Sequence, residues 1–129
     1  MSDDQNTAIN YPTRPGEDMN EKDIQRQIVD YLRKTGWFVA ITSQKGFSFA
    51  TPGLPDLICV KFCIEQLECT NAHIPYPVDY KTSRTLWLEV KGPRGKQRLE
   101  QKNFQDGLEA QGGEYLLANS LDVVMEHLK

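Results

Sequence analysis

Residues 85–91, Thr-Leu-Trp-Leu-Glu-Val-Lys, decide the fold, because their alternation is that of a strand inside a covered sheet. Successive side chains of a strand point to opposite faces. One face therefore carries three aliphatic side chains, and the other carries Trp87, Glu89 and Lys91. The strand is apolar enough to be central. Because burying an unpaired charge costs several kcal/mol, we expect Glu89 and Lys91 to be paired or to bind a metal.

Helices and strands alternate around this segment. Asn20, followed three residues later by Asp23, resembles a capping box with Asp in place of Glu. The order α-β-β-β-α-β-α predicts an α/β fold with a mixed central sheet flanked by helices. The expected elements are a helix from Asp18 or Asn20 to Gly36, strands over 37–42, 56–62, 85–91 and 114–118, a helix over 97–111, and a last helix capped by Ser120.

The remaining segments predict one domain with a tail. Residues 1–16 are polar, with two Pro and a Gly, and indicate a flexible tail. Residues 17–129 form a single domain. Residues 43–55 are typical of a loop. Residues 63–84 show no clear period, so we expect an insertion that is either a loop or a long hairpin tip.

Composition excludes several classes of protein. The 129 residues are 39% hydrophobic and 26% charged, enough for one core. Lys and Arg total 15 and Asp and Glu total 18, so the net charge is −3. This balance excludes a uniformly basic nucleic-acid coat and argues against a polybasic membrane binder. We expect no membrane span and no signal peptide. Three Cys residues indicate a reducing cytoplasm.

The basic side chains concentrate in one place. Residues 91–102 hold five basic side chains and one acidic side chain. Such a run is usually a solvated helix start. The alternative is a loop that faces phosphate.

Two carboxylates are expected to meet on neighbouring strands. The turn Gly53-Leu54-Pro55 delivers Asp56 to the start of a buried strand, and Glu89 lies on the strand that follows. Each feature alone is common, as a turn before a strand or as an internal ion pair. Together with Lys91 they form a candidate site for Mg²⁺, which prefers oxygen ligands and retains waters and phosphate oxygens.

Two helical residues extend this set. Glu21 precedes Ile24 and Ile28 by three and seven residues, so we expect it on the face of the buried stripe. The alternative is an acid favoured by the helix dipole. Gln101 lies three residues before Phe104 on the core-facing side of its helix, where its amide needs a partner. The alternative is a surface glutamine.

In this order the residues resemble the PD-(D/E)xK nuclease superfamily, and within it the virus-type replication-repair nuclease (VRR-NUC) domain. The resemblance rests on a helical Glu21, a G-x-P-D-L turn at 53–57, an E-V-K strand at 89–91 and a Q-x-x-aromatic helix at 101–104. It covers most of the chain, from about Glu21 to Val124. It implies a restriction-endonuclease-like core, in a bacterial cell or in a phage-infected host cell.

The resemblance implies an Mg²⁺- or Mn²⁺-dependent endonuclease that cleaves DNA. Asp56 and Glu89 would ligate the metal with the backbone carbonyl of Val90, and Glu21 would be a further ligand, directly or through water. Lys91 would position or activate the attacking water. The fifth catalytic residue, Gln101, would support the site or contact phosphate.

Free-standing members of the family resemble Holliday-junction resolvases and tend to be homodimers, which suits the two-fold symmetry of a four-way junction. DNA is the expected partner, with salt-sensitive affinity, and neither a membrane nor a small-molecule substrate is expected. The 33 residues from Asp56 to Glu89 exceed what a simple hairpin needs, which leaves the choice of substrate open. The DNA-binding candidates are Lys45, Arg84, Arg94, Lys96, Arg98 and Lys102.

Three other functions remain open. The first is a non-catalytic DNA-binding or interaction module on the same fold. The second is a nuclease that cuts flaps or single strands. A sequence-specific restriction enzyme ranks lower, because so short a chain has little surface for a recognition element.

Overall fold

The computed structural model describes residues 19–43, 51–67 and 78–129. Its elements follow the predicted order α-β-β-β-α-β-α, which confirms an α/β fold with a mixed sheet flanked by helices. In the described part of the chain no helix is long and apolar enough to cross a bilayer. The elements are α1 (Glu21–Lys34), β2 (Phe38–Ile41), β3 (Leu57–Leu67), β4 (Val78–Val90), α2 (Leu99–Ala110), β5 (Glu114–Ala118) and α3 (Leu121–His127).

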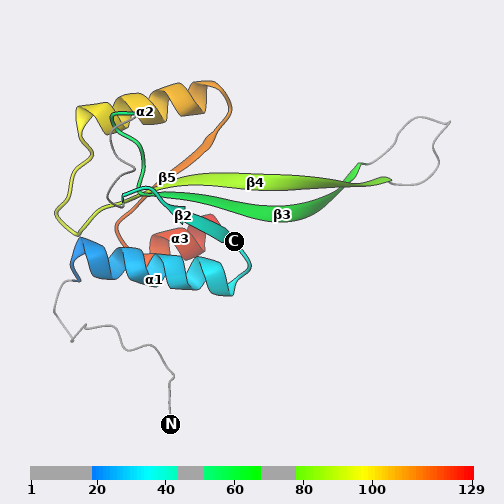
Figure 1. Cartoon of the computed structure of the whole chain (residues 1–129), viewed down its shortest axis with the longest axis horizontal. Coiled ribbons are helices and arrows are strands. Elements are labelled where there is room, and N and C mark those ends of the chain that lie inside the picture. Colours follow the sequence, from blue (N-terminus) through cyan, green and yellow to red (C-terminus); the bar gives the residue numbers. More distant parts are fainter. Residues whose placement is uncertain (1–18, 44–50, 68–77) are drawn as a thin grey trace, which may run out of the picture.

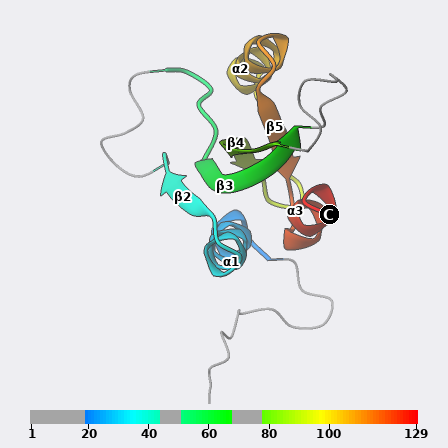
Figure 2. The ribbon, with the colours of Figure 1, turned by 90° about the vertical axis from the view of Figure 1, so that its right-hand side faces the viewer.

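The sheet has the strand order β2-β3-β4-β5. β2 and β4 are antiparallel to β3, whereas β5 is parallel to β4. Helix α2 connects the parallel pair and covers one face of the sheet, and α1 and α3 cover the other (Figures 1 and 2). The predicted strand over 85–91 is therefore the end of β4, between β3 and β5.

The alternation predicted for β4 is confirmed. Leu86, Leu88 and Val90 are fully buried on the side of α1 and α3. Register pairs the first two of them with Cys59 and Leu57 of β3, which are also fully buried. The opposite face carries Trp87 and Glu89 toward α2. Both faces of β4 are thus covered near its end, as its position in the sheet requires.

Helix α1 is defined by its ends as well as by its apolar stripe. The side chain of Asn20 accepts a hydrogen bond from the N–H of Asp23, as the capping pattern predicts. At the other end the N–H of Trp37 donates to the carbonyl of Leu32 and that of Gly36 to Arg33, while Gly36 has a φ of 97°. This is a Schellman motif, and it turns the chain directly into β2.

The segment predicted as an insertion is largely strand. β2 pairs with residues 57–60 of β3, and β5 pairs with residues 86–90 of β4, so both partners cover only the near end of the β3–β4 hairpin. Beyond them the two long strands continue as a ribbon that projects from the body of the domain (Figure 1). Of the two alternatives for 63–84, the hairpin agrees with 63–67 and 78–84. Residues 68–77 and the predicted tail over 1–16 lie outside the described residues.

The loop before Asp56 packs against the start of α2 with no room for a side chain. Gly53 has a φ of 81°, a conformation that L-residues rarely adopt. A Cβ at this position would lie 2.2 Å from the backbone oxygen of Glu100 and 2.9 Å from the nitrogen of Gln101. Gly53 therefore allows the loop that carries Asp56 to meet the helix that carries Gln101.

We expect Gly53→Ala to lower the free energy of unfolding by about 2 kcal/mol or more, because it adds left-handed strain to a backbone clash. Urea denaturation followed by circular dichroism measures this change. Gly107→Ala is the matched control, since nothing lies within 4 Å of its Cβ position inside α2. The control should be stabilised by about 0.5–1 kcal/mol. Equal stability of Gly53→Ala and the parent protein would contradict the close approach.

Candidate functional site

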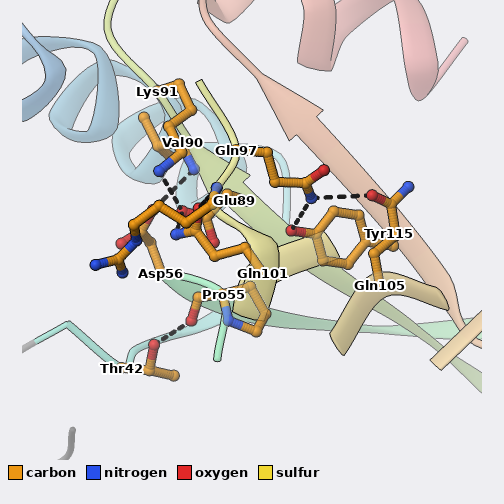
Figure 3. A network of polar contacts seen from close by, with 11 residues as sticks. Thr42, Pro55, Asp56, Glu89, Val90, Lys91, Gln97, Gln101, Gln105 and Tyr115 are labelled. Carbon is orange, nitrogen blue, oxygen red and sulfur yellow. Dashed lines mark hydrogen bonds and ion pairs between the residues drawn. The ribbon is translucent and has the colours of Figure 1, made fainter. Parts of the chain in front are cut away.

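Four of the five predicted catalytic residues come together in the structure. Asp56, Glu89, Lys91 and Gln101 lie around one point where β3 begins and β4 ends, beneath the start of α2 (Figure 3). They are linked by hydrogen bonds and an ion pair that run through Glu89 and the backbone of β4. The fifth, Glu21, is exposed at the start of α1.

Asp56 is held from two sides. Its side-chain Oδ2 accepts a hydrogen bond of 2.8 Å from the N–H of Val90 in β4. Its backbone carbonyl accepts one of 2.8 Å from the N–H of Thr42, at the end of β2. The buried hydroxyl of Thr42 also donates to the carbonyl of Pro55. Asp56 is thereby fixed at the edge of the site although it lies just outside β3.

Glu89 is the most buried member of the site, with 2% of its surface exposed. Its hydrogen bond from Gln101 and its contact with Lys91 fall on the same oxygen. Oε2 accepts a hydrogen bond of 2.7 Å from Nε2 of Gln101 and lies 3.4 Å from Nζ of Lys91. Among the described residues, Oε1 has no hydrogen-bond partner. A buried acceptor without a partner is costly, so Oε1 is the atom of this site that most needs a ligand.

Gln101 orients Glu89 through an amide whose two ends are both engaged. Its Oε1 accepts a hydrogen bond of 2.8 Å from the N–H of Arg98, at the start of α2, while its Nε2 donates to Glu89. The side chain is 4% exposed. Rotating the amide would place two acceptors against each other, so its orientation is fixed. This agrees with the prediction of a core-facing glutamine and not with a surface one.

One ring contact and two hydrogen bonds of Gln97 hold α2 in this position. The rings of Trp87 and Phe104 lie 5.6 Å apart, across the interface between β4 and α2. Nε2 of Gln97 donates to Oε1 of Gln105 at 2.9 Å and to the hydroxyl of Tyr115 at 3.2 Å (Figure 3). These contacts fix the helix from which Gln101 reaches Glu89.

The environment of Glu89 favours its neutral form. Burial, and after it the negative charge and the hydrogen bonding of Asp56, raise the pKa of its carboxyl from 4.5 to about 8, against an opposing effect of Lys91. The carboxyl therefore holds its proton at neutral pH while no divalent cation is bound. A divalent cation would compete with that proton for the same oxygens.

The donor set fits a divalent cation of the Mg²⁺ type. Such ions bind oxygen ligands, often one or two carboxylates with several waters. Asp56 and Glu89 supply the carboxylates, and Oε1 of Glu89 is the buried oxygen that lacks a partner. Val90, whose N–H donates to Asp56, follows Glu89 in β4. Its carbonyl remains a predicted ligand. Within residues 19–43, 51–67 and 78–129, no group of three or more His, Cys, Asp or Glu side chains could hold a metal.

The placement of Glu21 differs from the expectation. The buried acid in the first turn of α1 is Asp23, which pairs with Arg26 at 2.7 Å, whereas Glu21 is exposed. The reason is its position as the first helical residue, where no preceding turn covers the side chain. Glu21 nevertheless lines a cavity of about 500 Å³ together with Asp56. It therefore lies at the approach to the site.

Arg84 has a structural role that the sequence did not indicate. It forms two hydrogen bonds, of 2.9 and 2.6 Å, with Glu114 of β5, and these lower the pKa of that carboxyl. His127 also contacts Glu114, at 2.6 Å, and the guanidinium of Arg84 lies over the ring of Trp37. This cluster lies on the face of α1 and α3, opposite Glu89.

The other DNA-binding candidates are largely exposed. Arg94, Lys96, Arg98 and Lys102 all reach solvent, and Lys102 pairs with Asp106 at 3.1 Å. Lys45 lies outside the described residues.

Thr42 is the site residue that the sequence did not predict. A single threonine at a strand end carries no signal, because its partners are backbone atoms distant in sequence.

No protein-family model, curated protein or solved structure matches this chain. The geometry of the site and the sequence motifs are therefore the basis for the function proposed below.

The raised pKa of Glu89 predicts a pH dependence of stability in EDTA. The native carboxyl holds its proton up to about pH 8, whereas an unfolded chain releases it near 4.5. Because the native state binds more protons in this window, stability should fall as pH rises, by at most about 1.4 kcal/mol per pH unit from this group.

Glu89→Gln should remove that contribution, because its amide does not titrate. Urea denaturation at half-unit steps from pH 5 to 8 measures the difference between the variant and the parent protein. Glu109→Gln, at an exposed position of α2, is the matched control and should keep the parent slope. Identical slopes in Glu89→Gln and the parent would show that Glu89 is ionised in the native protein.

Proposed function

We propose that this chain is a metal-dependent, structure-selective DNA endonuclease of the VRR-NUC type that hydrolyses phosphodiester bonds. The observation that carries the proposal is the buried Glu89, whose Oε1 has no partner among the described residues, beside Asp56 and Lys91. A carboxylate is costly to bury on a central strand for stability alone. Its arrangement with a second carboxylate and a lysine is that of a site for a cation and a phosphate.

Asp56, Glu89 and the carbonyl of Val90 would hold Mg²⁺ or Mn²⁺. When bound, such a cation polarises a phosphoryl oxygen and lowers the pKa of a water that it ligates. Glu21, exposed at the approach, would contribute through a water.

The chain's own residues set the geometry of the reaction. Lys91 is 13% exposed and lies 3.4 Å from Glu89, so its ammonium is held between the buried carboxylate and the open side of the site. There it can donate to the attacking water or to a phosphate oxygen, where negative charge develops. Gln101 acts through Glu89 and is a positioning residue.

The resolvase part of the proposal requires two sites on one junction, and therefore a homodimer. The β3–β4 ribbon offers a surface of the kind that a second copy would bury. Phe62 and Ile64 share one face of β3 and are 60% and 64% exposed. Phe38 of β2, opposite Val60 on that same face, is 69% exposed. A two-stranded ribbon is marginally stable alone in water, so burial of this face against its symmetry mate would stabilise both copies.

A non-catalytic DNA-binding module is the second candidate. The observation that favours it is the number of carboxylates at the centre, two rather than three, with Glu21 exposed. In such a module the Glu89–Lys91–Gln101 group would be a structural network. DNA binding would then be the same with Mg²⁺ and with EDTA.

Cleavage of end-labelled single strand, duplex, 5′ flap and four-way junction tests the enzyme. We expect cleavage with Mg²⁺ or Mn²⁺ and none with EDTA. Glu89→Gln and Lys91→Ala should each lower the rate at least about a hundredfold, since each removes charge stabilisation at the reacting phosphate. Glu109→Gln is the control for expression and purification, and thermal unfolding verifies that each variant is folded.

Paired symmetric nicks in the junction alone would support a dimeric resolvase. Cuts in flaps or single strands would support the catalytic site and reject the resolvase. Full activity in folded Glu89→Gln would exclude this site as the catalytic centre. Absence of cleavage, with DNA binding insensitive to EDTA, would favour the binding module.

A further inference from the structure

Three basic residues of α1 lead to Asp56 along one side of the helix. The cavity of about 500 Å³ lies between α1, the end of β2 and Asp56. Lys22, Arg26 and Arg33 line it, at intervals of four and seven residues. Val29, which lines it as well, continues the same helical stripe. The cavity is therefore a groove along the helix that ends at the candidate catalytic site.

The dimensions of this groove suit a polymer of phosphates. From Lys22 to Arg33 the helix rises about 16 Å, at 1.5 Å per residue. One strand of DNA carries a phosphate every 3.4 Å or so along the helix axis, so this length spans several nucleotides. Val29 and Ile41 supply an apolar surface between the cations. A single small anion would not need cations distributed over such a length.

The arginines are held in place and keep donors for a ligand. Arg26 pairs with Asp23 at 2.7 Å, yet 54% of its side chain is exposed. Arg33 donates to the carbonyl of Val39 at 3.2 Å. A guanidinium has five N–H donors, so one contact leaves most of them available. Contacts within the protein therefore already hold both side chains at the groove, so a ligand would need to reorder them little.

Acidic residues also line the groove, and their placement fits a phosphate path. Asp56 and Glu21 lie at the end where the cation site is proposed, and a bound divalent ion would offset their charge. Asp30 has an interaction of its own within the protein. From Arg26 to Arg33 the lining carries two cations and one acid, Asp30.

A second cavity, of about 340 Å³, continues on the other side of Asp56. It shares Asp56 and Ser43 with the first and is lined by Arg98, Thr51 and Gln101 among others. Among the described residues, the candidate catalytic position is therefore bordered by a cavity on two sides. The described residues do not form a wall that would stop the end of a DNA strand at the site.

We propose that one strand of the DNA substrate runs along α1, with its phosphates on Lys22, Arg26 and Arg33, passes over Asp56 and continues toward Arg98. This inference rests on the proposed function. It adds that the cleaved DNA strand passes through the site and does not end there. It also moves the main phosphate contacts from the basic run at 91–102, where the sequence suggested them, to α1.

Salt-dependent binding of fluorescein-labelled 20-mer single strand and duplex, in EDTA, tests the α1 path. Each phosphate contact contributes about 0.9 to the slope of log K against log[KCl] for duplex and about 0.7 for single strand. Lys22→Ala/Arg26→Ala should therefore lower the magnitude of the slope by about 1.8 or 1.4. With binding at 1 M KCl unchanged, this weakens binding at 100 mM KCl about 60-fold for duplex or about 25-fold for single strand. Lys34→Ala/Lys129→Ala, which removes two exposed charges outside both cavities, should bind as the parent does.

Two further variants keep the result interpretable. Lys22→Ala/Arg26→Lys restores one charge beside Asp23 and should recover about half of the slope change. Lys96→Ala/Lys102→Ala tests the basic run directly. A slope that falls for this pair and not for Lys22→Ala/Arg26→Ala would overturn the α1 path.

A four-way junction whose arm ends are all closed by hairpin loops tests continuity through the site, because it has no strand end. Cleavage of this junction by the parent protein with Mn²⁺ is expected, whereas cleavage only of junctions with open arm ends would overturn the passage toward Arg98. Failure of this inference can be distinguished from failure of the proposed function. A protein that cuts DNA but binds equally well as Lys22→Ala/Arg26→Ala rejects the path alone. A protein that cuts nothing but binds through α1 rejects hydrolysis alone.

Discussion

The burial of one carboxyl group, that of Glu89, is the constraint on which this domain depends. It lies on a central strand, covered by α2, at 2% exposure. A carboxyl in such a place must be neutral, paired or bound to a cation. The protein provides a donor from Gln101 and a nearby ammonium from Lys91, both at Oε2. The packing of Trp87 against Phe104 and the close approach at Gly53 hold α2 where Gln101 reaches Glu89.

The same constraint connects stability with function. A pKa raised to about 8 means that ionising Glu89 costs stability in the metal-free protein. Under the proposed function, a cation that took the place of the proton would offset this cost, because it would give Oε1 a ligand. Ionisable groups with strongly shifted pKa values concentrate at functional sites.

Patterns in the sequence predict the parts of this structure that depend on local periodicity. The alternation at 85–91 predicts which residues lie on each face of β4. The caps at Asn20 and Ser120 predict where α1 and α3 begin. The hairpin over 63–84 remained one of two alternatives, because its outer half has no covered face and therefore no alternation to detect. Thr42 was missed because its partners are backbone atoms far away in sequence. The basic stripe of α1 is spread over three turns, so a count along the chain favoured the denser run at 91–102.

Proton release on cation binding tests the central claim most directly. Calorimetric titration of the protein with Mn²⁺ at pH 7, in two buffers of different ionisation enthalpy, measures the number of protons released. If Glu89 is neutral in the free protein and ligates the cation, close to one proton leaves per ion from this group, and the number falls toward zero above pH 9. Glu89→Gln should lose this binding. Binding of Mn²⁺ without proton release, or equal binding by Glu89→Gln, would contradict the account.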